Sequence, residues 1–162
     1  MLHSSKLSER AIDKNWYFDA CALEEKKRLG SLATACSKGG AIVVVSHLSL
    51  GEAYGSCVKK DNNDISRGGE GERLRTFNSL IQELCNAEYL CVVSNEDIDE
   101  ILEKTRDYFK LSITDAMHLA TALKHHCQIV KTTDRDLSGL NASKLKQLGS
   151  LFNNPHFQIC TF

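Results

Sequence analysis

Four acidic residues carry the chemistry that this sequence suggests, namely Asp19, Glu52, Asp115 and Asp134. Asp19 and Asp134 follow apolar runs that predict strands. Glu52 and Asp115 lie near the starts of predicted helices. A carboxylate beside apolar segments is costly to bury unless something positive neutralises it. Several carboxylates converging on one point would also repel one another, and the natural compensator is a hard divalent cation that prefers oxygen ligands, such as Mg²⁺ or Mn²⁺.

Each acid also has an ordinary structural explanation when it is considered alone. Asp19 and Asp115 could each cap the helix that follows. Glu52 is common near a helix start, and Asp134 could be a turn residue, as could Asp136 two positions later. The hypothesis of a shared site therefore depends on the four acids together, in their order and local contexts.

The elements that would position these acids alternate along the chain. Apolar, β-branched or aromatic runs predict strands at 15–19, 41–45, 89–93, 128–131 and 157–162. Apolar residues spaced three and four apart predict helices at 23–37, from 46 or 49 to about 60, 72–87, 96–109, 114–126 and 145–148. Strands alternating with helices predict an α/β fold, a three-layer α/β/α sandwich around a mainly parallel sheet. In such folds, sites form at the carboxyl ends of the strands.

Polar residues mark the boundaries of these elements. Ser46 or Ser49 could cap the second helix, and Asn95 is predicted to cap the helix that starts at residue 96. The stretch 61–71 is rich in Asp, Asn, Gly and Ser, and therefore predicts a loop. Substitution of Asp61 by Asn in this loop is expected to leave any activity of the four-acid site unchanged.

Length and composition bound the class of protein. A chain of 162 residues fits one domain, expected at 15–162 after a polar N-terminal extension at 1–14. A formal net charge of −1 argues against a generally basic nucleic-acid coat, so any polyanion binding needs a local patch and a metal. No stretch approaches the ~20 apolar residues that span a bilayer, and the N-terminus lacks the apolar core of a signal peptide. We therefore expect a cytoplasmic protein with no membrane partner.

The cysteines do not form a recognisable metal or disulfide framework. There are seven, an odd number that cannot all pair internally, and no two are spaced as C-x-x-C. His125, His126 and Cys127 look like metal ligands, but adjacent residues on a helix point in different directions. Most of the cysteines are expected to be reduced, buried small hydrophobes.

The four acids lie in segments that resemble, in order, the motifs of the PIN-domain nucleases. The segment YFDACAL resembles the opening motif, and SLGEAYGS resembles the second. The most specific segment is ITDAMHLATAL, and IVKTTDRDL resembles the closing strand and turn. The resemblance runs from about Asn15 to Leu137, which is most of the chain.

This resemblance implies a metal-dependent endoribonuclease, most like the VapC-type ribonuclease toxins. Asp19, Asp115 and Asp134 are then the expected ligands of one or two Mg²⁺ or Mn²⁺ ions. Glu52 would bind metal or orient the attacking water, and Asp136 is a further candidate ligand. Such ions lower the pKa of a bound water and neutralise charge growing on the phosphate, so no side-chain nucleophile is needed.

Other residues could assist this site. Thr132 and Thr133 could hydrogen-bond the ligand carboxylates, and His118 could contact the site, although a packing role is favoured. Cys21 stands where the family usually has Ser or Asn, which puts a contact to a metal-bound water in doubt. Phosphate contacts are conceivable for six basic residues, whose more ordinary role is that of solvated surface charges: Lys26, Lys27, Arg28, Lys59, Lys60 and Arg135.

Three functions remain open at the level of sequence. The first is the toxin of a type II toxin–antitoxin pair, which implies an RNA substrate, a small antitoxin protein and a homodimer. The second is a housekeeping RNA-processing nuclease. The third is a non-catalytic PIN scaffold that binds RNA or protein, and metal-dependent cleavage would separate it from both enzymes.

Overall fold

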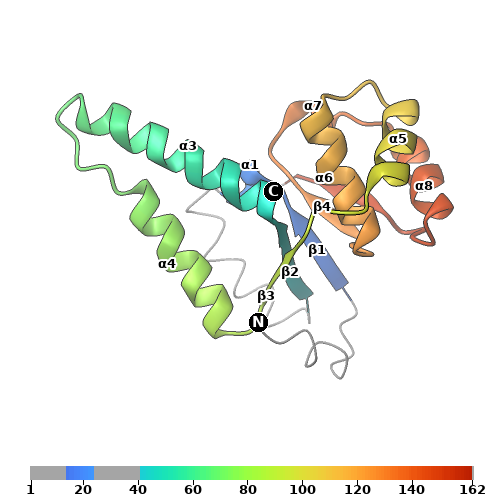
Figure 1. Ribbon diagram of the computed structural model, residues 1–162, viewed down its shortest axis with the longest axis horizontal. Helices are drawn as coiled ribbons and strands as arrows, with labels where there is room; N and C mark the ends of the chain where they lie inside the picture. The colour runs from blue at the N-terminus through green and yellow to red at the C-terminus, as the bar shows by residue number, and fades with distance from the viewer. Residues whose placement is uncertain (1–13, 24–40, 162) are drawn as a thin grey trace.

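The computed structural model describes residues 14–23 and 41–161, which form a parallel sheet with helices on both faces (Figure 1). The strands of this part of the chain are β1 Lys14–Phe18, β2 Ala41–Ser46, β3 Leu90–Val93, β4 Ile129–Lys131 and β5 Gln158–Cys160. Their order across the sheet is β3-β2-β1-β4-β5, and every neighbouring pair is parallel. The predicted α/β sandwich is therefore confirmed.

The strand order creates a switch point beside β1. From β1 the chain adds β2 and β3 on one side, and then returns to add β4 and β5 on the other side. The connections that leave the carboxyl ends of β1 and β4 therefore run to opposite sides, which is the position where sites form in such sheets. Asp19 directly follows β1, and Asp134 lies three residues beyond β4.

The helices of the described residues cover the two faces of this sheet. They are α1 Ala20–Leu23, α3 His47–Ile65, α4 Arg73–Asn86, α5 Asp99–Tyr108, α6 Ile113–Lys124, α7 Arg135–Ser138 and α8 Ala142–Leu151. In Figure 1, α3 and α4 lie to one side of the sheet and α5 to α8 to the other. Each strand alternates its side chains between these two layers.

That alternation produces two hydrophobic cores. Phe18, Val43 and Val45 pack with Phe77 and Leu84 on the α3–α4 side. The second core, on the opposite face, contains Tyr17, Val44, Val130, Leu119, Leu123 and Leu148. Every residue of β2 is buried, as its continuous β-branched run predicts for a strand covered on both faces.

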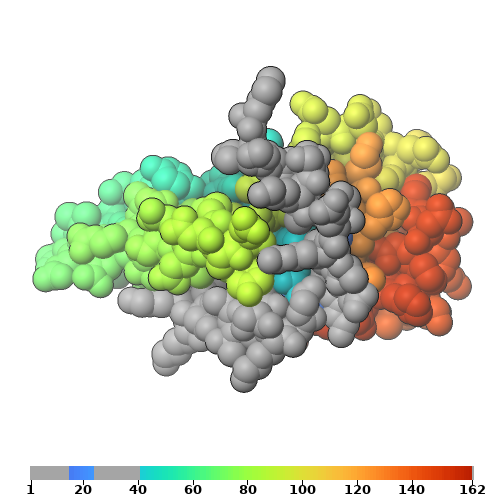
Figure 2. Space-filling model, turned by 90° about the horizontal axis from the view of Figure 1, so that it is seen from below, coloured from blue at the N-terminus to red at the C-terminus, as the bar shows by residue number. Residues whose placement is uncertain are grey.

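Helix α3 is longer than the sequence predicts. The predicted loop at 61–71 is wrong for its first five residues, because α3 continues to Ile65. Asp61 is buried there, and its two carboxylate oxygens accept the backbone N–H groups of Arg73 and Leu74 at the start of α4. The two helices form a hairpin whose tip stands apart from the other described elements (Figures 1 and 2).

The predicted cap of α5 is also wrong. Helix α5 begins at Asp99 and not at residue 96, and Ile98 occupies its N-cap position. Asn95 instead accepts the N–H of Leu48 through Oδ1 and donates through Nδ2 to Thr121 Oγ1. It therefore ties the start of α3 to α6, and its polar side chain serves a tertiary contact.

The remaining boundaries differ from prediction by a few residues, with α8 the longest extension, at 142–151 in place of 145–148. Ser46 is the N-cap of α3 and accepts the N–H of Ser49, so the first of the two predicted caps is confirmed. The predicted helix at 23–37 and the extension at 1–14 lie almost entirely outside the described residues. No described helix combines the length and apolar character that crossing a bilayer requires.

The described cysteines are less buried than the sequence predicts. Cys57 and Cys127 are buried, but Cys21 and Cys85 are exposed and two more are only half-buried, namely Cys91 and Cys160. Burial raises the pKa of the Cys127 thiol far above its ordinary value. That thiol therefore stays protonated at neutral pH and packs as a small hydrophobe.

Candidate active site

Asp19 is a buried carboxylate held by donors from two elements. It is 3% exposed, and its Oδ1 accepts the N–H of Ala22 at 2.8 Å, so it caps α1 as its ordinary structural explanation predicts. Its Oδ2 accepts the hydroxyl of Thr132, which follows β4. Burial raises the pKa of Asp19; these two hydrogen bonds oppose the rise, and the charge of Asp134 adds to it.

Asp134 is joined to Asp19 through the same threonine. The N–H of Asp134 donates to Thr132 Oγ1 at 2.9 Å, and this hydroxyl in turn donates to Asp19. The Asp134 Oδ1 caps α7 by accepting the N–H of Asp136 at 2.6 Å and that of Leu137 at 3.4 Å. The structure thus brings Asp19 and Asp134 together at the switch point, and Thr132 makes the predicted contact to a candidate ligand.

Glu52 is linked to α6 through a buried histidine. Its Oε2 lies 2.9 Å from Nε2 of His118, and the two side chains are 37% and 4% exposed respectively. The packing role favoured for His118 is therefore incomplete, because the side chain also makes a polar contact to a candidate site residue. His118 also contacts the hydroxyl of Tyr17, two residues before Asp19 on β1, at 2.8 Å, so Glu52 belongs to the same neighbourhood.

Asp115 is held at the start of α6. Ser112 is the N-cap of this helix, and its Oγ accepts the N–H of Asp115 at 3.1 Å. The same hydroxyl donates to Asp115 Oδ2 at 2.6 Å. Asp115 therefore completes a cap made by Ser112, and it lies one turn before His118 on the same helix face.

Asp136 and the described basic residues make fewer contacts to the site than the four acids do. Asp136 is exposed, and among the described residues only its backbone N–H takes part in a hydrogen bond, the one to Asp134. Arg135 is exposed beside it, and the side chains of Lys59 and Lys60 are exposed on α3. The basic run at 26–28 lies outside the described residues. The role of these cations as phosphate contacts stays a prediction.

The described carboxylates do not form the compact cluster that the sequence predicts. Among residues 14–23 and 41–161, no three His, Cys, Asp or Glu side chains form a group that could hold a metal ion. Each acid accepts hydrogen bonds from its own surroundings, as Asp115 does from Ser112 and Glu52 from His118. The Asp19–Asp134 pair remains as the centre of the site.

The donor set nevertheless fits a hard divalent cation. Mg²⁺ is commonly bound through one or two carboxylates and keeps several waters, so a pair of aspartates is sufficient. The hydrogen bonds of the described residues leave one carboxylate oxygen unengaged on Glu52 (Oε1), on Asp115 (Oδ1) and on Asp134 (Oδ2). These oxygens can accept from bound waters, and nitrogen or sulfur ligands that would favour a softer metal are not part of the pair.

Sequence reasoning missed the polar residues beneath Glu52 and His118. The hydroxyl of Tyr17 contacts Nδ1 of His118 at 2.8 Å and the hydroxyls of Ser46 and Ser49 at 2.9 and 3.0 Å. The sheet register offers a signal, because Tyr17 pairs with Val44 and Ser46 lies two residues further along the same face. Polar side chains at the carboxyl end of two buried strands could have indicated this network.

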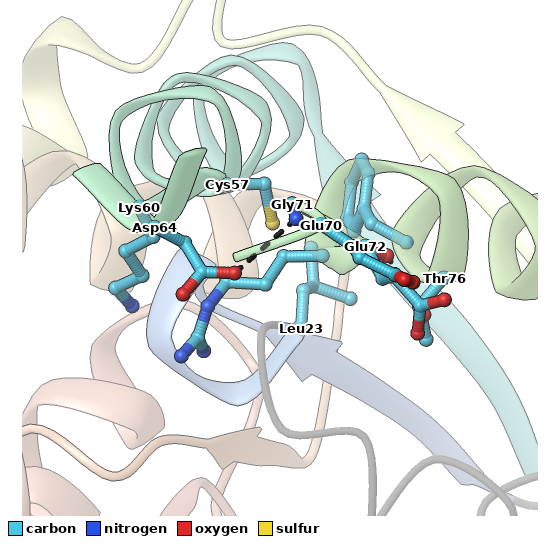
Figure 3. A pocket seen from close by; sticks show the side chains of 10 residues that line it. Leu23, Cys57, Lys60, Asp64, Glu70, Gly71, Glu72 and Thr76 are labelled. Carbon is cyan, nitrogen blue, oxygen red and sulfur yellow. Dashed lines mark hydrogen bonds between the residues drawn. The ribbon is translucent and has the colours of Figure 1, made fainter. Parts of the chain in front are cut away.

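The cavity shown in Figure 3 lies apart from these carboxylates. It has a volume of about 460 Å³ and lies between α3 and α4, lined by Cys57, Lys60, Asp64, Arg73 and Phe77 among others. None of the candidate carboxylates lines it. The Asp64 carboxylate points across it to the N–H of Gly71 at 3.2 Å, which is a contact within the hairpin.

Comparison with known proteins gives the family. No curated protein matches the chain. The crystal structure of PAE2754 from Pyrobaculum aerophilum is similar, with a TM-score of 0.56 and 18% sequence identity, over 92% of this chain and 100% of that chain, and this likeness shows the fold. The PIN domain family model matches residues 18–142, a span that contains all four acids and most of the chain. This chain therefore belongs to the PIN domain family.

Proposed function

We propose that this protein is a metal-dependent endoribonuclease that hydrolyses RNA phosphodiester bonds with a metal-activated water. Membership of the PIN domain family supports a nuclease, because PIN domains are generally nucleases. The observation that carries the proposal is the pair of acids at the switch point. Asp19 and Asp134 both bond to Thr132 where β1 and β4 end, as a site between diverging loops requires.

Asp19 and Asp134 would hold a Mg²⁺ or Mn²⁺ ion, with Asp115 and Glu52 completing the site directly or through water and Asp136 as a further candidate ligand. Such an ion lowers the pKa of a bound water and neutralises charge that develops on the phosphate. Burial favours this arrangement, because a carboxylate whose pKa is raised by desolvation gains from a cation beside it.

The protein's own residues orient the reactants. Thr132 holds Asp19 and Asp134 in fixed positions relative to each other, since one hydroxyl contacts both residues. Glu52 would orient the attacking water through the oxygen that His118 leaves unengaged. Arg135 is exposed at the start of α7, where its charge would contact a phosphate. Hydrolysis would leave a 5′-phosphate and a 3′-hydroxyl.

The biological setting within this proposal is the toxin of a type II toxin–antitoxin pair. The resemblance to small PIN-domain proteins, which are mostly toxins of this type, supports it. Its partners would be a cognate antitoxin protein that covers the acidic pocket and a second copy of the chain, and its location the cytoplasm. A housekeeping RNA-processing nuclease would use the same site on other RNAs. A neighbouring short gene for a DNA-binding protein would favour the toxin.

A non-catalytic scaffold is the second candidate, and two observations favour it. The described residues contain no group of three potential ligands, and Cys21 stands where the family usually has Ser or Asn. A scaffold would retain the fold and bind RNA or protein without cutting.

The test is cleavage of a mixed RNA pool by the purified protein with Mn²⁺ or with EDTA, together with the melting temperature in both. We expect cleavage only with Mn²⁺ and a higher melting temperature with the ion, because a ligand that binds only the folded state stabilises it. Asp115→Asn should lower cleavage by orders of magnitude, and Glu52→Gln should behave similarly but retain more of the thermal shift.

A matched control distinguishes the general loss of one negative charge from the loss of a carboxylate in the site. Asp107→Asn removes one negative charge from the exposed face of α5 and should leave both cleavage and the thermal shift unchanged. Wild-type protein that neither cleaves nor shifts with Mn²⁺ would favour the scaffold. Full activity in Asp115→Asn would show that the carboxylate site does not perform the cleavage.

A further inference from the structure

A buried network of four polar side chains lies beneath the site, between the sheet and helices α3 and α6. Tyr17, Ser46 and Ser49 are fully buried, and His118 is nearly so. Their contacts are Tyr17 Oη to His118 Nδ1 at 2.8 Å, to Ser46 Oγ at 2.9 Å and to Ser49 Oγ at 3.0 Å, with Ser46 and Ser49 3.1 Å apart. Buried polar groups are costly unless all are satisfied, so the direction of each hydrogen bond is strongly constrained.

The contact between His118 and Glu52 determines which ring nitrogen of His118 carries a proton. Nε2 of His118 lies 2.9 Å from the Glu52 carboxylate, and an ionised carboxylate only accepts hydrogen bonds. Nε2 must therefore carry a proton. In the neutral ring Nδ1 is then an acceptor, and the nearest group able to donate to it is the Tyr17 hydroxyl. Ser49 Oγ lies further away, at 3.4 Å.

The tyrosine is suited to donate. Burial raises the pKa of Tyr17 far above its ordinary value, so the phenol keeps its proton. The Ser46 and Ser49 hydroxyls can donate to the phenol oxygen, which leaves the phenol proton for Nδ1. This direction satisfies every polar group of the network, from the serines through Tyr17 and His118 to Glu52.

These hydrogen bonds end at Glu52 and fix the position of its carboxylate. The side chain of Glu52 is 37% exposed on α3, and an exposed glutamate samples several rotamers. The imidazole of His118 cannot move in the same way, because its ring is buried and bonded on both nitrogens. Oε2 is thereby held, and no hydrogen bond among the described residues engages Oε1.

We propose that Tyr17 and His118 are positioning residues for the reaction: the Tyr17 hydroxyl holds His118 as its Nε2–H tautomer, and that N–H holds Glu52 in the orientation that aligns the attacking water. The proposal rests on the nuclease function proposed above, because only that function gives Glu52 a water to align. The alternative is a network that merely stabilises the core between β1 and α6.

Tyr17→Phe is the sharpest perturbation, because it removes one hydroxyl and keeps the ring that packs in the core. We expect kcat on one RNA to fall at least about tenfold with KM unchanged, since misplacing a reacting group costs rate more than binding. His118→Gln, whose amide can still donate to Glu52, should retain more kcat than His118→Leu. A merely structural network would give equal losses for both His118 variants.

Two further measurements keep the outcomes separate. Thr121→Val removes the buried hydrogen bond from Asn95 on the same helix and should lower stability without changing kcat. The ¹⁵N NMR spectrum of the His118 ring, recorded in EDTA, should show mainly the Nε2–H tautomer in wild type. In Tyr17→Phe this tautomer should no longer predominate.

The two proposals fail in different ways. If wild-type protein cleaves RNA and Tyr17→Phe keeps full kcat, the positioning role is overturned and the nuclease stands. If wild-type protein does not cleave, the nuclease fails, and with it the purpose assigned to the network. An Nδ1–H tautomer or a doubly protonated ring in the wild-type spectrum would overturn the direction of the hydrogen bonds whatever the activity.

Discussion

Asp61 is predicted to stabilise the α3–α4 hairpin by capping α4 from the neighbouring helix. The N-cap residue of α4, Glu72, makes no side-chain cap hydrogen bond. Asp61 replaces it: its two oxygens accept the N–H groups of Arg73 and Leu74, both at 2.9 Å, while the residue is only 7% exposed. The change to test is Asp61→Ala, which leaves both N–H groups without this acceptor.

The magnitude follows from the contacts. Each lost hydrogen bond contributes about 1 kcal/mol net, and the lost negative charge at the start of a helix about 0.5 kcal/mol more. Alanine gains about 0.5 kcal/mol as a better helix former within α3. The free energy of unfolding should therefore fall by about 2 kcal/mol, which corresponds to a decrease in melting temperature of roughly 4–8 °C for a chain of this size.

The assay is chemical and thermal denaturation of Asp61→Ala beside Asn62→Ala. Asn62 is the next residue of α3 and is exposed, so its substitution should change the free energy of unfolding by no more than about 0.5 kcal/mol. Asp61→Asn should fall between the two, because the amide keeps one accepting oxygen. Equal stabilities for Asp61→Ala and Asn62→Ala would show that the cap contributes nothing to the stability of the hairpin.

Two further predictions concern ionisable groups. Burial raises the pKa of Asp19, so the folded protein is favoured when this carboxyl is protonated. That contribution to the free energy of unfolding is fully present below the ordinary pKa of an aspartate, and it is lost as pH rises through the folded-state pKa. The stability of Asp19→Asn relative to metal-free wild type should therefore increase as pH rises through the folded-state pKa of Asp19, measured by denaturation in EDTA. A stability difference between the two proteins that does not change with pH would contradict this. Thiol titration of the denatured protein without reductant should find all seven cysteines reduced, and a stable disulfide in protein from a reducing cytoplasm would contradict that expectation.

The sequence predicts the sheet well because burial on both faces leaves a plain pattern. The run at 41–45 is apolar and β-branched throughout, and β2 is accordingly buried along its whole length. The same reasoning places Asp19 and Asp134 at strand ends, and the switch point then brings their loops together. These parts of the site follow from local pattern and the general behaviour of parallel sheets.

The errors occur where a polar residue has a distant partner. The polar composition of 61–65 predicts a loop, yet the segment is helical and the Asp61 side chain bonds to α4. Asn95 looks like a helix cap, yet its side chain joins Leu48 to Thr121. Local propensity cannot distinguish these uses, since the deciding partners lie 12 or more residues away along the chain.

The distance along the chain also explains why the network beneath Glu52 was missed. His118 is separated from Glu52 by 66 residues and from Tyr17 by 101. Ser46, Ser49 and Glu52 lie within one short stretch, but no window of local sequence joins that stretch to Tyr17 or to His118. Ser112 and Asp115, by contrast, are three residues apart, a spacing at which the serine and the acid form a helix cap that local sequence does encode.

The acids differ in how rigidly they are held, and that difference bears on the chemistry. Asp19 is buried and bonded through both oxygens, so its position follows the ends of β1 and β4. Glu52 lies on a long helix and depends on His118 alone. A site tolerates little displacement of its reacting groups, so the less constrained acid needs the stiffer support. The buried hydroxyl of Tyr17, which touches neither carboxylate, provides that support from the central strand of the sheet.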